Sequence, residues 1–375
     1  MKIKVDSSAL KGAVRDLQKV VDKRSAINIM RSVLLEADNG QLRLLATDGE
    51  ISLQREIKAE VEEGGKAAVE MENGLAAVLS LPDGDVMIET KGQTINITYH
   101  NGSFQLPTGN AENFQPYEAV VPSDRGTVLN NLFITAVRQA IPALSTQNLK
   151  PILQCIYIEV AGNGVSVVGA NGVIMVYNFI RGGYGNQQKV LLFGKAASVL
   201  LSLCRNKTEV SMFSDGNKVA LMGESFILTA AQAQGNYPNF RTILKDVKNG
   251  IKITADVDRR DLSDTLGRLL PFSDASNLAV LAFDVNTLSV SAEDKDFSRR
   301  SSERLSCSTF GDADKIAIGV NIKNIKSVID ILDTEHVSVL MQDRSKPMLI
   351  EPIVPEYEGG MASEILLMPM YLNKA

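Results

Sequence analysis

The chain of 375 residues lacks several features by which enzymes and metalloproteins are recognised. It contains no Trp, and aromatic residues make up only 5% of it, so we expect a mainly aliphatic hydrophobic core. Its two histidines, His100 and His336, belong to no cluster typical of a catalytic or metal site. No Walker phosphate-binding loop occurs either. We therefore expect a protein that is not an enzyme and that needs no metal or cofactor.

Cysteines and long apolar runs are scarce as well. Cys155, Cys204 and Cys307 lie far apart and form no C-x-x-C pair, which argues against a disulfide framework and favours a reducing compartment. Apolar runs such as Leu278–Phe283 are far shorter than the roughly 20 residues that a membrane-spanning helix needs. The first residues have no apolar core of a secretory signal. Together these absences predict a soluble cytoplasmic protein with no membrane partner.

An excess of positive charge is missing too. The 39 Lys and Arg residues are outnumbered by 44 Asp and Glu, which gives a net charge of −5 and a pI of about 5.4. A simple basic nucleic-acid-binding domain has a pI above roughly 9. The acidic balance argues against that class of protein, but it leaves room for positive charges gathered on one surface.

What the sequence does contain is a pattern that occurs three times. Each copy has an apolar run, a tight turn, a second apolar run and then a corner with an acidic or amide residue. The corners are evenly spaced along the chain, at Ala46–Gly49, Ala170–Gly172 and Ala292–Asp294. The strand pairs that lead into them are Val33–Leu45, Cys155–Val168 and Ala279–Val290. A repeat of this length is a domain rather than a short solenoid unit.

Helices and further strands are predicted at matching places in each copy. A helix is expected before each strand pair, over Ser8–Val21, Leu129–Leu144 and Arg259–Leu270. A second helix is expected after it, over Glu72–Leu81, Lys195–Leu203 and Ile322–Leu332. Further strands follow at Asp85–Tyr99, Thr208–Leu221 and His336–Ile353. We predict an α+β fold of three tandem domains, 1–121, 122–245 and 246–375, with polar boundaries near Val121–Asp124 and Lys245–Gly250.

Three local sequences point to a known family: Leu45–Gly49 (LATDG), Gly235–Arg241 (GNYPNFR) and Leu367–Met370 (LMPM). With these in place over three similar domains, the chain resembles the bacterial DNA sliding clamps, the beta subunits of DNA polymerase III. The resemblance implies three copies of a DNA-clamp domain, each with two inner helices and outer antiparallel sheets. It also implies a head-to-tail homodimer that closes as a ring.

The resemblance further implies the function of a processivity factor. Such a ring encircles double-stranded DNA without reading its sequence. It tethers the DNA polymerase III catalytic subunit, the clamp loader and other replication and repair proteins through a peptide-binding cleft between domains 2 and 3. An alternative is a tandem-repeat protein-interaction scaffold that does not encircle DNA. A hydrolase that uses His100 is a third hypothesis.

Positive charges on the first predicted helix favour contact with DNA over the scaffold. Lys11, Arg15, Lys19 and Lys23 recur every four residues, so we expect them on one stripe of that helix. A solvated cationic face is the other interpretation. By resemblance the DNA-facing set also includes Arg24, Gln147 and Lys150, and Lys195 at the start of a predicted helix is a further candidate. Lys195 could equally be an ordinary lysine at a helix start.

The peptide-binding cleft is placed by resemblance alone. Its residues are Leu153, Gly172, Val173, Ile174, Met175, Pro238, Ile243, Ser345, Pro347, Leu366, Met368, Pro369, Met370 and Tyr371. Methionine side chains adapt to varied apolar partners, which suits such a surface. The alternative is that Met368 and Met370 are core residues of a last strand.

The chain departs from the family pattern within this set. Ala170-Asn171 stands where Thr-Asp is usual, Val173-Ile174-Met175 replaces a His-Arg-Leu-like run, and Tyr371 replaces a common arginine. We expect a more apolar cleft with fewer polar anchors. The dimer interface is left open by the sequence: Leu269–Phe272 is a candidate, but core burial explains this run as well.

Overall fold

The computed structural model describes residues 1–114, 126–147, 150–184, 186–204, 209–311, 316–354 and 360–372. The domain boundary predicted near Val121–Asp124 lies outside these ranges. Among the described helices, none is long and apolar enough to cross a membrane.

One order of elements occurs three times along the described chain: strand, helix, four strands, helix or 3₁₀ turn, three strands. The first copy comprises β1 (Lys2–Asp6), α1 (Ser7–Leu17), β2 (Ser32–Asp38), β3 (Gln41–Thr47), β4 (Ile51–Glu63), β5 (Gly65–Glu70), η2 (Leu75–Ser80), β6 (Asp85–Lys91), β7 (Thr94–Tyr99) and β8 (Gly102–Pro107). The second comprises β9 (Thr127–Leu129), α2 (Asn131–Ala140), β10 (Cys155–Ala161), β11 (Gly164–Ala170), β12 (Ile174–Arg181), β13 (Gln188–Phe193), α3 (Gly194–Leu203), β14 (Val210–Ser214), β15 (Lys218–Gly223) and β16 (Phe226–Ala231).

The third copy follows helix α4 (Phe240–Asn249), which lies between the second and third copies in the sequence. It comprises β17 (Ile253–Asp258), α5 (Arg259–Leu269), β18 (Leu278–Asp284), β19 (Thr287–Asp294), β20 (Arg299–Gly311), β21 (Ile316–Asn321), α6 (Ile322–Ile329), β22 (His336–Met341), β23 (Met348–Pro352) and β24 (Met361–Leu367). The α+β architecture with three similar copies, predicted from the sequence, is confirmed. We refer to the three copies below as repeats 1, 2 and 3.

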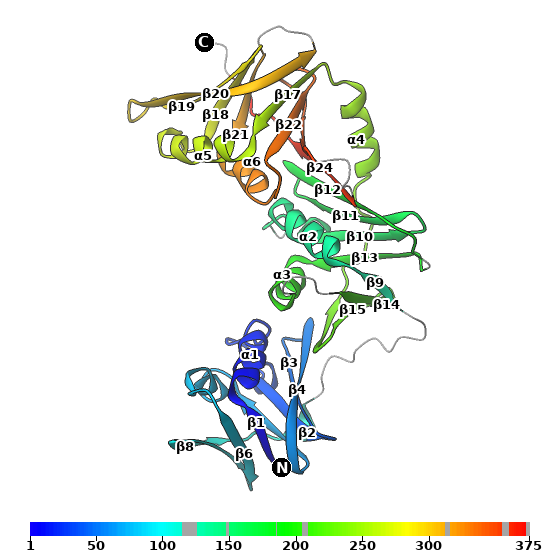
Figure 1. Ribbon diagram of the computed structural model, residues 1–375, viewed down its shortest axis with the longest axis vertical. Helices are drawn as coiled ribbons and strands as arrows, with labels where there is room; N and C mark the ends of the chain where they lie inside the picture. Colours follow the sequence, from blue (N-terminus) through cyan, green and yellow to red (C-terminus); the bar gives the residue numbers. More distant parts are fainter. Residues whose placement is uncertain are drawn as a thin grey trace. The chain divides into compact units, whose positions relative to one another are not determined.

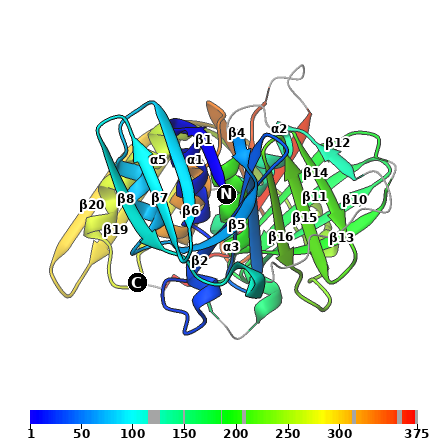
Figure 2. The ribbon, with the colours of Figure 1, turned by 90° about the horizontal axis from the view of Figure 1, so that it is seen from below.

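The chain forms two compact units, residues 1–131 with 192–233 and residues 132–191 with 234–375. In the first unit the antiparallel sheet runs β8-β7-β6-β1-β4-β16-β15-β14-β9, and β2, β3 and β5 join it beside β4. In the second it runs β13-β10-β11-β12-β24-β23-β22-β17-β20-β19-β18-β21. Figure 2 shows β6, β7 and β8 side by side, and likewise β14, β15 and β16. The division into three domains at the boundaries given above stays a prediction.

Helices cover the sheet of the second unit on both faces. α5 and α6 pack side by side on one face, over a core of Leu, Ile and Val side chains (Figure 1). α4 lies on the other face, where Phe240 and Leu244 are buried against Val168 and Leu366. The Asp6 and Asp258 side chains cap α1 and α5 by accepting hydrogen bonds from the Ala9 and Asp261 amides, so the first helix of repeats 1 and 3 starts in the same way.

Several predicted helices are shorter than the sequence pattern indicated: α2 ends at Ala140 rather than Leu144, and α6 ends at Ile329 rather than Leu332. Two further cases are in repeat 1. α1 ends at Leu17 rather than Val21, because the Lys19 and Val20 amides donate to the carbonyls three residues back, those of Asp16 and Leu17, which tightens the chain into a turn. The segment 72–81 forms only the 3₁₀ turn η2, which Gly74 precedes and Pro82 follows. Apolar periodicity placed both segments correctly but did not fix where their helical hydrogen bonds stop.

Candidate functional site

The three repeats share one polar corner at the end of each hairpin. Asp48, Asn171 and Asp294 each accept two backbone hydrogen bonds through one side-chain oxygen, from the amides two and three residues further on. The donor–acceptor distances are 2.9 and 2.7 Å at Asp48, 2.9 and 2.8 Å at Asn171, and 3.1 and 3.2 Å at Asp294. Carboxylates and amides stabilise such turns equally well, which explains why either residue type occurs here.

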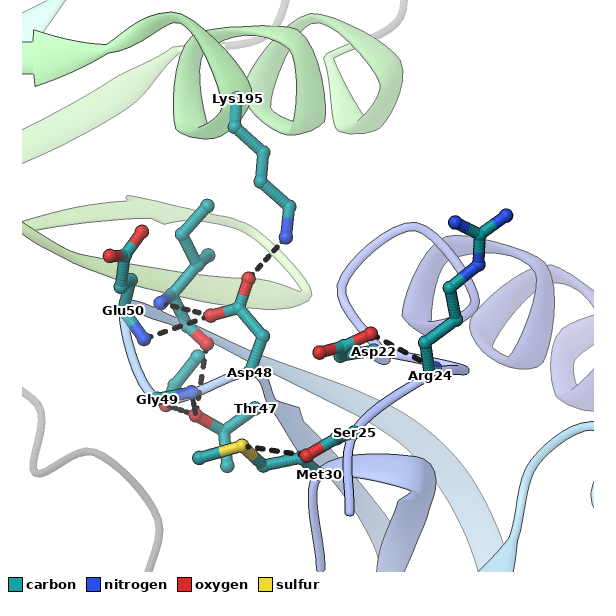
Figure 3. Close-up of polar contacts among 11 residues, drawn as sticks. Asp22, Arg24, Ser25, Met30, Thr47, Asp48, Gly49, Glu50 and Lys195 are labelled. Carbon is teal, nitrogen blue, oxygen red and sulfur yellow. Dashed lines mark hydrogen bonds and ion pairs between the residues drawn. The ribbon is translucent and has the colours of Figure 1, made fainter. Parts of the chain in front are cut away.

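The second carboxylate oxygen of Asp48 binds Lys195 at the start of α3 (Figure 3). The Asp48 side chain is only 7% exposed, whereas that of Lys195 is 53% exposed. This ion pair links the corner of repeat 1 to a helix of repeat 2. The charge of Lys195 is therefore already paired, which makes it a weaker candidate for binding phosphate than the sequence alone indicates.

Of the predicted cationic stripe, Lys11 and Arg15 lie on α1, whereas Lys19 and Lys23 follow the end of the helix. The Lys11 ammonium lies 2.7 Å from Asp83 and donates to the Leu81 carbonyl at 2.9 Å. The continuous helical stripe expected from the spacing is thus interrupted, because the helix ends at Leu17, before its third member Lys19.

Two more cations of the stripe are paired with acidic groups. Lys19 lies 3.4 Å from Asp16, and Lys23 lies 2.8 Å from Glu72. Arg15 is exposed, and no ion pair or hydrogen bond to its side chain is found among the described residues. It is therefore the stripe residue best able to bind a phosphate group.

Arg24, Gln147 and Lys150 are all exposed, as a role in DNA contact requires. The Arg24 amide donates to Asp22 at 3.0 Å, and its guanidinium points away from that carboxylate (Figure 3). The Gln147 amide donates to the Ser145 hydroxyl at 3.2 Å, and the Gln147 carbonyl accepts from the Gln154 side chain at 3.1 Å. The assignment of these residues to DNA contact stays a prediction.

The sequence analysis missed a further exposed cation, Arg138 on α2. It follows the buried residue Val137 as Arg15 follows the buried residue Val14, so the two arginines occupy the same position in their helices. No partner of the Arg138 side chain is found in the described part of the chain. Superposing the apolar patterns of the first helices would have revealed it. Repeat 3 has Gly267 at this position.

Exposed apolar side chains gather where β12 and β24 meet. Ile174 pairs with Leu367, and just beyond this pair the Met368 amide donates to the Val173 carbonyl at 2.9 Å. Met368 is 45% exposed and follows the end of β24, so it is not a core residue. Val173 is also largely exposed, and it lies in a corner with exposed Gly172. These residues form an apolar surface whose backbone is fixed by strand pairing.

The other residues assigned to the cleft are partly buried beneath it and partly exposed on its surface. Ile174, Met175 and Leu366 are buried, and the last two pack in the cluster that holds α4. Surface-exposed members are Pro238, Ile243, Ser345 and Tyr371, and half-buried ones are Leu153, Pro347, Pro369 and Met370. The Met370 amide donates to the Gly319 carbonyl at 2.8 Å, which ties the end of the chain to β21.

Stacked aromatic rings stiffen the wall beside this surface. Tyr237 stacks on Tyr157 with ring centroids 5.1 Å apart, and Phe240 packs on Tyr177 at 5.2 Å. Burial raises the pKa of Tyr157 to about 12, so its hydroxyl stays protonated at neutral pH. The cluster therefore supplies a neutral, rigid support for α4 rather than a titrating group.

No group of three or more His, Cys, Asp or Glu side chains in the described part of the chain could hold a metal ion. The three cysteines are free and buried, and burial raises the pKa of Cys155 and of Cys204 to about 12. The thiolates of Cys155 and Cys204 are thus scarce at neutral pH.

Comparison with known proteins finds similar proteins over the whole chain. Residues 1–118 match the family described as DNA polymerase III beta subunit, N-terminal domain. The beta sliding clamps of Helicobacter pylori (strain J99) and Streptomyces coelicolor are 22% and 24% identical to the chain. The alignments cover 99% and 100% of this chain, and 100% of each relative.

Two crystal structures have the same fold over the whole chain. A Pseudomonas aeruginosa DNA polymerase sliding clamp with ligand has a TM-score of 0.87 at 20% identity. A Helicobacter pylori beta clamp bound to a DNA ligase peptide has a TM-score of 0.86 at 22% identity. Each comparison covers 99% of this chain and 100% of the other.

Proposed function

We propose that this chain is a bacterial DNA sliding clamp, the beta subunit of DNA polymerase III, and thus a non-catalytic processivity factor. The match of residues 1–118 to that family and the alignment with beta sliding clamps over the whole chain support this proposal. In this function a ring-shaped homodimer encircles duplex DNA in the cytoplasm. The polymerase III catalytic subunit, the clamp loader and other proteins bind to its peptide-binding surface. Tethering raises the effective concentration of the polymerase at the primer end, so each peptide contact can be weak.

The observation that carries this proposal concerns the strands that join one repeat to the next. Two such pairings are present, and we call each of them a strand junction; at the equivalent place in repeat 3 the second strand is absent among the described residues. β16 pairs with β4 along Ile51–Arg55, and β24 pairs with β12 along Ile174–Ile180. In both junctions, the last strand of one repeat pairs with a strand of the preceding repeat. The strand it pairs with is the one that directly follows the polar corner, β4 in repeat 1 and β12 in repeat 2. In the described part of the chain, the equivalent edge of β20, along Arg299–Ser306, has no such strand. The outer edge of β8 is unpaired among the described strands too.

A second copy of the chain can complete both edges. Unpaired strand edges attract other strands, so native proteins cover them or pair them. If β8 of one copy joins β20 of another, the first copy still has a free β20 edge for β8 of the second. The contact is head-to-tail, and two copies are enough to close it. The resulting assembly has six similar repeats.

The cations support passage of DNA through the ring without tight binding. Arg15 and Arg138 are exposed and without partners among the described residues, whereas Lys11, Lys19, Lys23 and Lys195 are each paired with a carboxylate. A small number of available cations attracts the phosphate backbone without reading bases. Weak contacts of this kind suit a protein that must slide.

The exposed apolar surface supports the tethering of partners. Val173 and Met368 lie side by side on paired backbone, and Ile243 and Tyr371 are exposed apolar residues of the same predicted site. Apolar side chains on a rigid support can receive a short peptide with few ordering costs on the protein side. The clamp of Helicobacter pylori was crystallised with such a peptide, from DNA ligase.

Retention on circular DNA tests the clamp function. The protein is loaded by its cognate clamp loader onto a nicked circular duplex and washed in high salt, and the circle is then cut. A threaded ring stays bound in salt that removes charge-only complexes, and it leaves once the DNA is linear. Release by salt from the intact circle, or persistence on the cut DNA, would contradict threading and favour the scaffold.

A further inference from the structure

A backbone contact ties the polar corners of repeats 1 and 2 to the last strand of the repeat that follows. The Ala231 amide, at the end of β16, donates to the Glu50 carbonyl at 2.9 Å. The Met368 amide, directly after β24, donates to the Val173 carbonyl, also at 2.9 Å. Glu50 and Val173 both stand two residues after the side chain that holds the corner. The two corners are therefore joined to the next repeat at the same position.

The second helix of the following repeat is placed alike at both corners. α3 contacts β16, and α6 contacts β24. Just before each helix, the chain pairs with the segment that follows this strand, Leu192 with Gln232 and Gly319 with Met370. Lys195 is the second residue of α3, and Lys323 is the second residue of α6. Lys323 therefore stands at the corner of repeat 2 as Lys195 stands at the corner of repeat 1.

The two corners differ in charge. In repeat 1 the second carboxylate oxygen of Asp48 binds the Lys195 ammonium (Figure 3). In repeat 2 the atom at this position is the amide nitrogen of Asn171, because Oδ1 accepts both backbone hydrogen bonds. An amide nitrogen is a hydrogen-bond donor and cannot bind an ammonium group. Lys323 is exposed, and no ion pair or hydrogen bond of its side chain is found in the described part of the chain.

The corner of repeat 2 therefore has two donors and lacks an acceptor for them. In repeat 3 Asp294 binds Arg299 at 2.6 Å, so the corners of repeats 1 and 3 each contain an acid with its cation. The turn of repeat 2, Ala170–Ile174, contains no acidic residue. An ammonium and an amide at one place suit a carboxylate, which can accept hydrogen bonds from both. The exposed apolar residues Val173 and Met368 lie at the same corner.

On the premise that the proposed peptide surface binds partners, we propose that Lys323 and the Asn171 amide bind a carboxylate of the partner peptide. The ligand is an Asp or Glu side chain next to the apolar residue that covers Val173 and Met368. Apolar contacts supply most of the affinity, and the acidic residue decides which partners bind preferentially. Asn in place of Asp in this turn thus leaves the cation available to a partner instead of pairing it within the chain.

Matched peptides test this preference. A labelled clamp-binding peptide from the cognate polymerase is scanned, with Asp and then Asn placed at each position in turn, and binding is measured by fluorescence polarisation. At one position we expect Asp to bind the wild-type protein about fivefold more tightly than Asn. Lys323→Gln should reduce this ratio to less than about twofold and leave the affinity for the Asn peptide unchanged.

Two further variants separate the corner from general charge. Asn171→Asp keeps the turn, as Asp48 does in repeat 1, and gives Lys323 a partner within the chain, so it should abolish the preference as well. Lys195→Gln is the matched control. It removes the same charge from the same helix position in repeat 2, but this charge is already paired with Asp48, so the preference should persist.

The outcomes distinguish this inference from the proposed function. If the wild type prefers Asp at no position, or if the preference survives either Lys323→Gln or Asn171→Asp, the acid-binding role is overturned while the peptide surface stands. Equal loss of the preference in Lys195→Gln would also overturn it, because net charge rather than this corner would then decide. A polymerase peptide that fails to bind the wild type at all would instead refute the peptide surface, and this inference with it.

Discussion

At the scale of single residues, the polar corner occurs once in each repeat, and the three corners differ in what they bind. Asp48, Asn171 and Asp294 hold the same turn, but they differ in what the other side-chain atom does. Asp48 binds Lys195 and Asp294 binds Arg299, whereas no second contact of Asn171 is found in the described part of the chain. The corner that lacks an ion pair is the one beside Val173 and Met368. Replacing a carboxylate by an amide therefore leaves this corner free of a bound cation, next to the predicted peptide site.

The ion pair of Asp48 can be separated from its turn. Asp48→Asn keeps the turn, as Asn171 does in repeat 2, and loses only the attraction to Lys195, so we expect a loss of about 0.5–1 kcal/mol in the free energy of unfolding. Asp48→Ala removes the turn as well and should cost about 2 kcal/mol. Urea unfolding measures both. Equal losses would mean that the turn contributes nothing.

Met368 offers a test of the peptide surface at the same scale. Met368→Ala should weaken the binding of a labelled clamp-binding peptide from the cognate polymerase about tenfold, because an exposed anchor is lost. It should leave the unfolding free energy nearly unchanged, since Met368 is half-exposed in the free protein. Met87→Ala, on a half-buried strand position of β6, is the matched control. Unchanged peptide affinity, measured by fluorescence polarisation, would move the site elsewhere.

At the scale of elements, the strand junctions define a register for the missing contact. Phe226, the first residue of β16, faces Arg55, and Gly102, the first residue of β8, should likewise face Glu303 of a second copy. Ser103 then faces Ser302. Both serines are exposed, and directly opposite residues on antiparallel strands point to the same face.

Cross-linking tests this register. Ser103→Cys/Ser302→Cys should form a covalent dimer on mild oxidation, because opposite Cα atoms lie within the roughly 4.4–6.8 Å that a disulfide needs. Ser103→Cys/Ser301→Cys is off by one residue, which turns one side chain to the other face and should give far less product. The native cysteines are buried and do not compete. Non-reducing electrophoresis reads out the result, and equal yields would refute the register.

The ends of the helices and strands show how far the structure could be predicted from the sequence. The first two hairpins were predicted within about two residues, because turn residues such as Asn39-Gly40 and the alternation of apolar residues fix them locally. In the third hairpin, β19 continues to Asp294 rather than ending at Val290. The end of α1 was not predicted either, because it depends on backbone hydrogen bonds beyond Leu17. Pairing of Lys11 with Asp83, 72 residues away in the chain, leaves no local signal at all.

At the scale of the whole molecule, a ring threaded on DNA should bind linear and circular DNA differently. Its binding to linear DNA should depend on its positive charges, and its retention on a circle should not. Arg15→Ala/Arg138→Ala should weaken binding to a short linear duplex, where attraction to phosphate is all that holds the protein. The slope of log K against log salt should fall by about 1.8 if both arginines release a counterion. Once loaded on a nicked circle, the same variant should be retained like the wild type, because topology rather than attraction holds it. Lys11→Ala, whose charge is already paired with Asp83, is the control and should change the slope little. If the double variant were lost from the circle at the rate at which it leaves linear DNA, the duplex would be gripped by these cations and not encircled.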